Sequence, residues 1–257
     1  MAEKDETAVQ ETFISHLVEL RGRLIRAILA VALLFACLVP WAGRIYDLLA
    51  LPMMENLPQG AQMIAVGVVS PVFVPLKVTA LVAFVCALPY VLYQIWAFIA
   101  PGLYAHEKRF AIPLVLGSTL LFLLGMTFCY FFVFKTVFRF ILTFSPTSIT
   151  VAPDIEQYLS FVIGMFIAFG VTFEVPIVVI LLAKTGLVSV EKLKQARPYV
   201  IVGAFVIAAV VTPPDVVSQL ALAIPMLLLY EVGLVIAAMV VKSTASQDLL
   251  PGADNTE

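Results

Sequence analysis

The sequence predicts an all-α integral membrane protein with six transmembrane helices, and three observations lead to this prediction. Hydrophobic residues make up 62% of the 257 residues, only 12% are charged, and the mean hydropathy is +1.07. A soluble domain is closer to half apolar and a quarter charged. The apolar residues gather in long runs, and Lys and Arg concentrate in alternate connections between these runs. Lipid is therefore the main solvent expected for this chain.

Six apolar runs have the length and composition of membrane-spanning helices or come close to it. Crossing a hydrocarbon core of about 30 Å takes roughly 20 apolar residues in a helix. Charged residues fall mainly between the runs, so the run ends mark the membrane surfaces. The expected spans are residues 24–42, 72–99, 111–134, 159–183, 198–212 and 217–241.

The connections give the rest of the expected organisation. Residues 43–71 and 135–158 are long enough to fold over the membrane surface, with room for short interfacial helices. Residues 1–242 are expected to form a single integral membrane domain. Residues 243–257 are polar and are expected to form a disordered cytoplasmic tail.

The fifth expected span is shorter than a bilayer. Its 15 residues, 198–212, give roughly 22 Å at about 1.5 Å per residue. Either the helix is short and thins the bilayer or is shielded by a partner, or its ends lie a few residues away. The Thr212-Pro213-Pro214-Asp215 turn fixes the outer end, because prolines cannot continue a helix interior.

The distribution of Lys and Arg predicts that both termini are cytoplasmic. Eleven Lys and Arg lie on the side of the termini and four on the other side, which matches the positive-inside rule for an even number of spans. The eleven are Lys4, Arg21, Arg23, Arg26, Lys108, Arg109, Lys184, Lys192, Lys194, Arg197 and Lys242; the four are Arg44, Lys77, Lys135 and Arg139.

Two carboxylates fall inside expected spans, where a charge costs about 2.5–3.5 kcal/mol on insertion scales. Glu174 is either a neutral carboxyl bonded to the carbonyl that Pro176 leaves free, or a polar spot that faces a cavity or a partner helix. Glu231 lies nearer to the cytoplasmic end of its span. Taken alone, these two residues would suit a proton-coupled secondary transporter.

Two further carboxylates lie near the expected cytoplasmic surface. Glu19 sits in a short helix before the first span and either pairs with Arg23 one turn later or offers its carboxylate to a partner. Glu107 follows the second span. Only two histidines are present and no cysteine cluster, so a metal site and catalysis by a Ser/His/Asp arrangement are not expected, nor is a cofactor. Nothing is basic enough to indicate nucleic-acid binding.

Several segments together resemble the hallmark segments of the TatC family of protein translocases, in order and spacing, over residues 13–241. Any one of them is a weak signal, whereas the set with six spans is specific. They are His16 to Arg21, Tyr93 to Phe98 continuing through Tyr104 to Glu107, Phe173 to Pro176, and Arg197 to Tyr199 continuing through Thr212 to Asp215.

The resemblance implies a receptor without catalytic chemistry, folded as a six-helix, cupped, glove-like bundle in the bacterial inner membrane. Such a receptor binds twin-arginine signal peptides of folded preproteins at its cytoplasmic face. It works with TatB, TatA and other TatC copies in export driven by the protonmotive force. These roles are implied by the resemblance and not by composition or spacing.

The resemblance also assigns residues. Glu19 and Glu107 would face the two signal arginines, with Leu20, Arg21, Phe98, Leu103 and Tyr104 on the same surface. Glu174 matches a polar residue inside the family's cup, and Thr212 and Gln219 lie where TatB or TatA would dock. Pro52 and Asp215 match family positions in the outer loops. Departures from the pattern occur at Gly22, Val66, Gly67 and Ala209.

Overall fold

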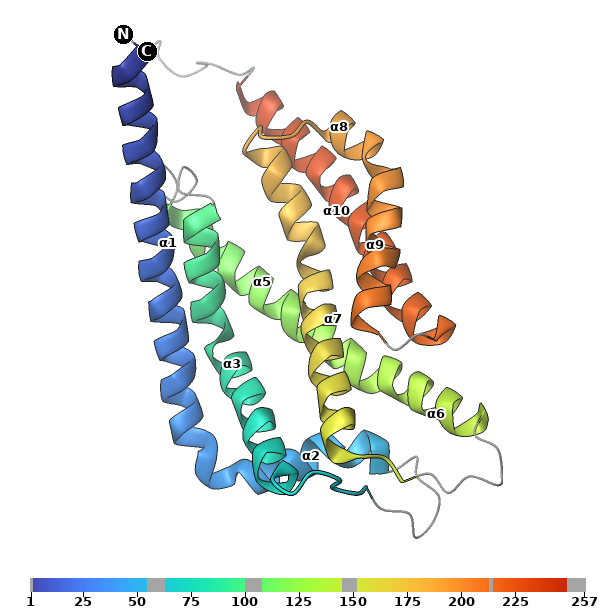
Figure 1. Ribbon diagram of the computed structural model, residues 1–257. Coiled ribbons are helices and arrows are strands. Elements are labelled where there is room, and N and C mark those ends of the chain that lie inside the picture. Colours follow the sequence, from blue (N-terminus) through green and yellow to red (C-terminus); the bar gives the residue numbers. More distant parts are fainter. Residues whose placement is uncertain (1, 55–62, 100–107, 145–151, 213–214, 249–257) are drawn as a thin grey trace, which may run out of the picture. The chain divides into compact units, whose positions relative to one another are not determined.

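The computed structural model describes residues 2–54, 63–99, 108–144, 152–212 and 215–248, and every regular element among them is helical (Figure 1). By length and composition, five of the helices in these ranges can cross a membrane, and a sixth, Arg197–Val211, is apolar but shorter. The chain divides into two compact units. Unit 1 comprises Met1–Leu51 and Ala65–Leu120, and unit 2 comprises Pro52–Ile64 and Leu121–Glu257.

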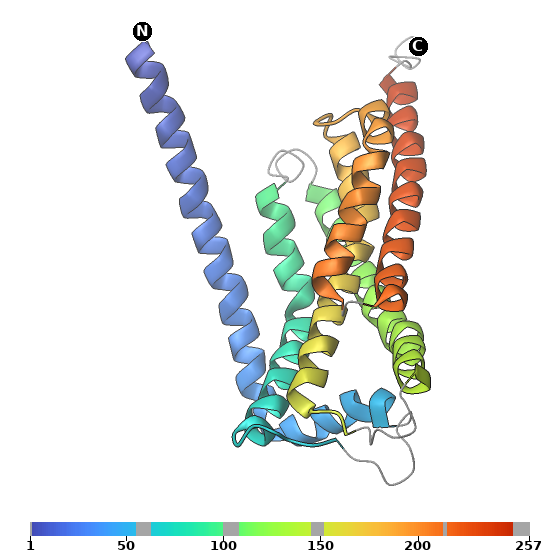
Figure 2. The same ribbon diagram turned by 45° about the vertical axis from the view of Figure 1, so that its right-hand side comes forward.

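Unit 1 is built around two antiparallel helices, α1 (Ala2–Leu38) and α3 (Ser70–Ile99) (Figures 1 and 2). A 3₁₀ turn, η1 (Val39–Trp41), ends α1, because Pro40 has no amide hydrogen to continue the helix. After this turn the chain changes direction into α2 (Ala42–Met54). Most of the apolar span of α1 is exposed, as expected for a helix in contact with lipid.

Unit 2 has α7 (Ile155–Lys184) between two sets of helices. The end of α5 (Lys108–Phe128), a π-helical turn η2 (Cys129–Val133) and α6 (Phe134–Phe144) form one continuous helical segment beside it. On another face α7 contacts α10 (Val216–Asp248), which is reached through α8 (Val190–Gln195) and α9 (Arg197–Val211). The start of α7 is fixed by its N-cap, Asp154, whose side chain accepts a hydrogen bond from the Gln157 amide.

Aromatic rings hold the α5–η2–α6 segment against α7. Ring centroids lie 5.8 Å apart for Phe128 and Phe169, 5.1 Å for Phe134 and Phe166, and 5.7 Å for Phe138 and Tyr158. Along the α5–η2–α6 segment, residues 128, 134 and 138 contact residues 169, 166 and 158 of α7 in that order, so the segment and α7 run antiparallel. These contacts replace the hydrophobic driving force, which is missing between helices in lipid.

The contact between α7 and α10 depends on the absence of a side chain at Gly233. A Cβ at this position would lie 2.9 Å from Pro176 Cα, so only glycine lets the two backbones approach this closely. Beyond this crossing, Val179 and Ala183 on α7 pack with Tyr230, Leu234 and Ala237 on α10.

The helices agree with most of the expected spans and correct two boundaries. The fifth apolar helix is short, with 15 residues. The third span was expected to end at 134, before a connection with room for short interfacial helices. The helix instead continues without a break through α6 to Phe144, because buried Val137 and Phe138 alternate with exposed Lys135 and Arg139. Helix α10 continues to Asp248, past the expected start of the tail at 243. The cytoplasmic termini, the six crossings and the cupped shape stay predictions.

A substitution at Gly125 tests the close packing of α5 on α7. A Cβ there would lie 2.5 Å from the Phe169 carbonyl oxygen, and backbone cannot move away cheaply. We expect Gly125→Ala to destabilise the protein by about 1–3 kcal/mol, measured as a lower thermal unfolding midpoint in detergent. Gly203→Ala is the control, because nothing lies within 4 Å of a Cβ at Gly203. Equal midpoints for the two variants would contradict the packing.

Candidate functional site

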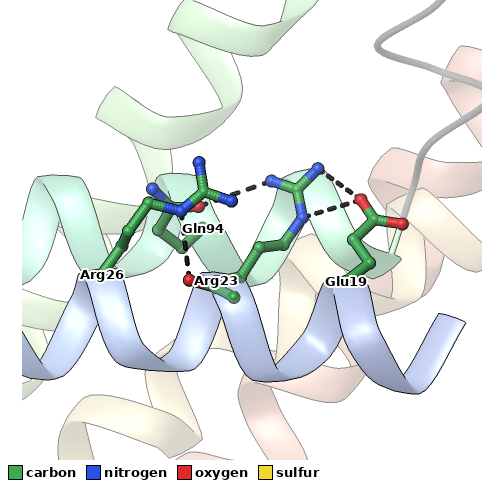
Figure 3. A network of polar contacts seen from close by, with 5 residues as sticks. Glu19, Arg23, Arg26 and Gln94 are labelled. Atoms are coloured by element: carbon green, nitrogen blue, oxygen red, sulfur yellow. Dashed lines mark hydrogen bonds and ion pairs between the residues drawn. The ribbon is translucent and has the colours of Figure 1, made fainter. Parts of the chain in front are cut away.

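A polar cluster of unit 1 lies where the middle of α1 meets the last part of α3 (Figure 3). We call Glu19, Arg23, Arg26 and Gln94 the Glu19 cluster. The first three lie at spacings of three or four residues on α1, so helical geometry brings them to one face. Gln94 belongs to α3, where it is buried.

Arg23 connects the two helices of unit 1. Its Nε and Nη2 atoms donate to Oε1 of Glu19 at 2.9 and 2.6 Å, and its Nη1 donates to Oε1 of Gln94 at 3.4 Å. The Arg26 Nε atom donates to the Gly22 carbonyl instead. The ion pair of Glu19 and Arg23, which spacing alone allowed, is therefore formed.

The Glu19 carboxylate stays accessible although it is paired. Its side chain is 42% exposed, against 20% for Arg23. Both hydrogen bonds from Arg23 go to Oε1, and within the described part of the chain Oε2 accepts none. A carboxylate oxygen of this kind can accept from an incoming cationic donor without losing the Arg23 contact.

The surroundings of Glu19 are apolar and aromatic. The His16 ring stacks on Phe98 of α3, with centroids 4.3 Å apart and an angle of 20° between the rings. Leu20 is 40% exposed and Arg21 is also exposed. The structure therefore brings Glu19, Leu20, Arg21 and Phe98 to one end of the α1–α3 pair.

The other three residues predicted for this surface, Leu103, Tyr104 and Glu107, lie outside the described residues. The meeting of Glu19 and Glu107 thus stays a prediction.

Glu174 lies on α7 in unit 2 and is 7% exposed. Its neighbours along the helix pack in different directions: Phe173 contacts α5 through Phe128, and Pro176 meets α10 at Gly233. The carboxyl group is therefore enclosed by helices, as expected for an intramembrane polar residue.

The residues around the α9–α10 turn have local structural roles. The Thr212 hydroxyl donates to the Ala208 carbonyl at 2.8 Å, and the Asp215 carboxylate accepts from the Ser218 amide at 2.7 Å, which caps α10. Gln219 is partly buried one turn later. A Cβ on Gly164 of α7 would lie 4.0 Å from the Val211 carbonyl oxygen, so Gly164 is the part of α7 beside this turn. Glu174 lies ten residues, or roughly 15 Å, further along α7 and is therefore not beside the turn.

Pro52 lies in the last turn of α2, a short helix of the kind expected in the connection over residues 43–71. Its assignment to an outer loop of the family stays a prediction. A helix reaches this far because residues 42–51 are mainly apolar and good helix formers, and Pro52 removes only one amide donor near the helix end.

Sequence reasoning missed the partner of Glu231. Arg197, at the start of α9, donates from Nη2 to Glu231 Oε2 at 2.7 Å, and both side chains are 47% exposed. Beside this pair the Tyr230 hydroxyl donates to the Leu193 carbonyl. The 34 residues between Arg197 and Glu231 hide this pairing in the sequence. The pair accounts for Glu231 as a surface contact between α9 and α10.

Gln94 was also missed, although its segment was singled out. A buried amide near the end of an apolar span needs a hydrogen-bond partner, and that requirement was the available signal.

Comparison with known proteins gives one consistent result. A sequence model described as Sec-independent protein translocase protein (TatC) matches residues 15–225. The chain is 50% identical over 228 residues to Sec-independent protein translocase protein TatC of Escherichia coli strain K12, covering 88% of both chains. It is also 50% identical over 239 residues to the protein of that name from Halothiobacillus neapolitanus, covering 91% of this chain and 65% of that one.

A solved structure agrees with the sequence relatives. A crystal structure of the twin arginine translocase receptor TatC is 41% identical to this chain, with a TM-score of 0.77, and the match covers 87% of this chain and 98% of that one.

The exposed pair of Glu231 and Arg197 leads to a prediction about stability. Surface ion pairs contribute about 0–1 kcal/mol. We therefore expect Glu231→Gln to change the thermal unfolding midpoint little, in contrast to Tyr230→Ala, which removes a buried ring and its bond to Leu193. Thermal unfolding of the purified variants checks this. A loss from Glu231→Gln as large as that from Tyr230→Ala would contradict it.

Proposed function

The chain belongs to the TatC family of Sec-independent protein translocase proteins, and from this premise we propose that it is the receptor subunit for twin-arginine signal peptides. As a family member it is a multi-pass membrane component of a protein translocase, with a transport role. In our proposal it binds signal peptides of folded preproteins at the cytoplasmic face of the bacterial inner membrane. TatB, TatA and further copies of the chain would complete the machinery, and the protonmotive force would drive export.

The observation that supports the proposal most is the accessible carboxylate of Glu19. An ion pair one helical turn apart at a surface contributes only about 0.3–0.5 kcal/mol. A hydrogen bond to a charged group contributes about 1.5–3 kcal/mol. An arginine from a peptide can therefore share or displace the Arg23 contact without a large cost.

Arginine is the chemically matched ligand for such a site. A guanidinium group offers parallel N–H donors that fit a carboxylate in a forked geometry, and lysine cannot reproduce this. Two adjacent arginines need two carboxylates, and Glu107 is the second one that we propose. The exposed Leu20 and the half-buried Phe98 provide apolar surface for side chains that flank the arginines.

The remaining assigned residues belong to later steps in our proposal. Glu174 would act inside the membrane after peptide binding, since its carboxyl is buried among helices of unit 2. Thr212 and Gln219 would contact TatB or TatA near the start of α10. The rival function, a proton-coupled transporter, loses support because Glu231 is exposed and paired with Arg197.

Substituting the two proposed carboxylates tests the receptor function. We expect Glu107→Gln to weaken crosslinking to a twin-arginine peptide about tenfold or more, because a charge-assisted hydrogen bond is lost. The double variant Glu19→Gln/Glu107→Gln should abolish it, with membrane insertion unchanged. Glu191→Gln removes an exposed carboxylate of α8 and serves as the matched control. Unchanged crosslinking by the double variant would refute the assignment.

Glu174 is tested separately, by comparing binding with export. We expect Glu174→Ala to bind the twin-arginine peptide like the unmodified chain but to export a folded reporter poorly. Peptide crosslinking in membranes and reporter export in cells measure the two steps. Normal export by this variant would count against a role in a later step.

A further inference from the structure

A basic hollow lies on α6, outside the residues used for the proposed function. It has a volume of about 370 Å³ and is lined by Lys135, Thr136, Arg139, Phe140 and Thr143. Lys135 and Arg139 are one helical turn apart, and both are exposed. Among the described residues neither forms an ion pair, so two like charges sit side by side without compensation. Such a pair is unfavourable unless an anion binds to it.

An apolar groove adjoins this hollow in the same unit. The groove has a volume of about 380 Å³ and lies between the α5–η2–α6 segment and α10. Thr136 lines both the hollow and the groove, so the two adjoin at this residue. In Figures 1 and 2, α6 lies beside the first part of α10. The other groove residues are Phe128, Phe132, Val133, Val217, Leu220, Ala221, Ile224 and Pro225.

The order of residues along the helices sets the direction of this site. Helix α6 runs antiparallel to α7, whereas α7 and α10 run in the same direction (Figures 1 and 2). Helices α6 and α10 are therefore antiparallel. Thr136 therefore lies near Val217, at the start of α10, and Phe128 lies toward Ile224, deeper along it. The end of α6 extends beyond the start of α10 in Figures 1 and 2. The basic end thus lies where the apolar part of α10 begins, which is the level of a membrane interface.

The length of the site matches one leaflet of a bilayer. From Phe128 to Arg139 the chain advances 11 residues, or roughly 16 Å at 1.5 Å per residue. Half of a hydrocarbon core of about 30 Å is roughly 15 Å. An acyl chain in the groove would therefore place its headgroup at the level of the two cations.

We propose that the adjoining hollow and groove bind one anionic phospholipid, with the phosphate between Lys135 and Arg139 and an acyl chain along the groove. Basic pockets beside apolar helix surfaces are a known form of lipid headgroup site. A free phosphate would use the hollow only, and an apolar helix of a partner would use the groove only. Charge and adjoining apolar surface favour the lipid.

The test is native mass spectrometry of the purified full chain, titrated in detergent with palmitoyl-oleoyl phosphatidylglycerol. The double variant K135Q/R139Q should bind this lipid about thirtyfold more weakly than the unmodified chain, because each cation near an anionic headgroup strengthens binding roughly fivefold. The control K192Q/K194Q removes two exposed cations of α8 and should bind it normally. Phosphatidylcholine with the same acyl chains should bind weakly to the unmodified chain and to both double variants.

Two further arms separate the lipid from other ligands. A221F fills the groove without changing charge and should also weaken binding of phosphatidylglycerol. Binding of phosphatidylglycerol to the unmodified chain should weaken as the salt concentration rises. This measurement needs no variant. Equal retention of phosphatidylglycerol by the unmodified chain and K135Q/R139Q would overturn the proposal. Competition by glycerol 3-phosphate as effective as that by the whole lipid would also overturn it, since the site would then bind an anion only.

Discussion

The constraint on which this structure depends is the lack of water inside a bilayer. Every backbone polar group in the hydrocarbon needs an internal partner, so the chain crosses as helices. Side-chain hydroxyls obey the same rule: those of Thr79, Thr119 and Thr127 donate to carbonyls one turn earlier on their own helices. Helices then associate through close contact rather than through hydrophobic burial, which explains why glycine at 125 and 233 is required where helices cross.

The same constraint favours charged side chains that are paired, and a pair that stays exposed can also serve function. In unit 1, Arg23 is held by Gln94 of α3 and in turn orients the Glu19 carboxylate. Arg23 therefore does two things: it keeps Glu19 in place and lowers the cost of holding that carboxylate near the membrane. In unit 2, Arg197 and Glu231 neutralise each other. The Glu19–Arg23 pair lies within one helix, whereas the Arg197–Glu231 pair joins α9 to α10.

Hydropathy predicted the helices well, because a span of lipid-facing residues has a composition that little else produces. It even gave the short fifth helix, since the Pro213-Pro214 pair sets its end. Boundaries with charged residues are less predictable: Lys135 and Arg139 mark the start of a connection in the sequence, although they lie on the exposed face of a helix that continues from the preceding span. Contacts between distant segments, such as Arg23 with Gln94, leave no periodic pattern in the sequence that would predict them. The family resemblance identified Glu19, but its geometry needed the structure.

The central claim is that paired guanidinium groups are recognised by Glu19 and Glu107. It is tested most directly by the affinity of the purified chain for two peptides that differ only in having Arg-Arg or Lys-Lys. We predict that the unmodified chain prefers Arg-Arg by about tenfold or more, which corresponds to about 1.4 kcal/mol. The preference should disappear when both carboxylates are replaced by amides. If the amide variant still prefers Arg-Arg to the same degree, the signal arginines are read elsewhere on the protein.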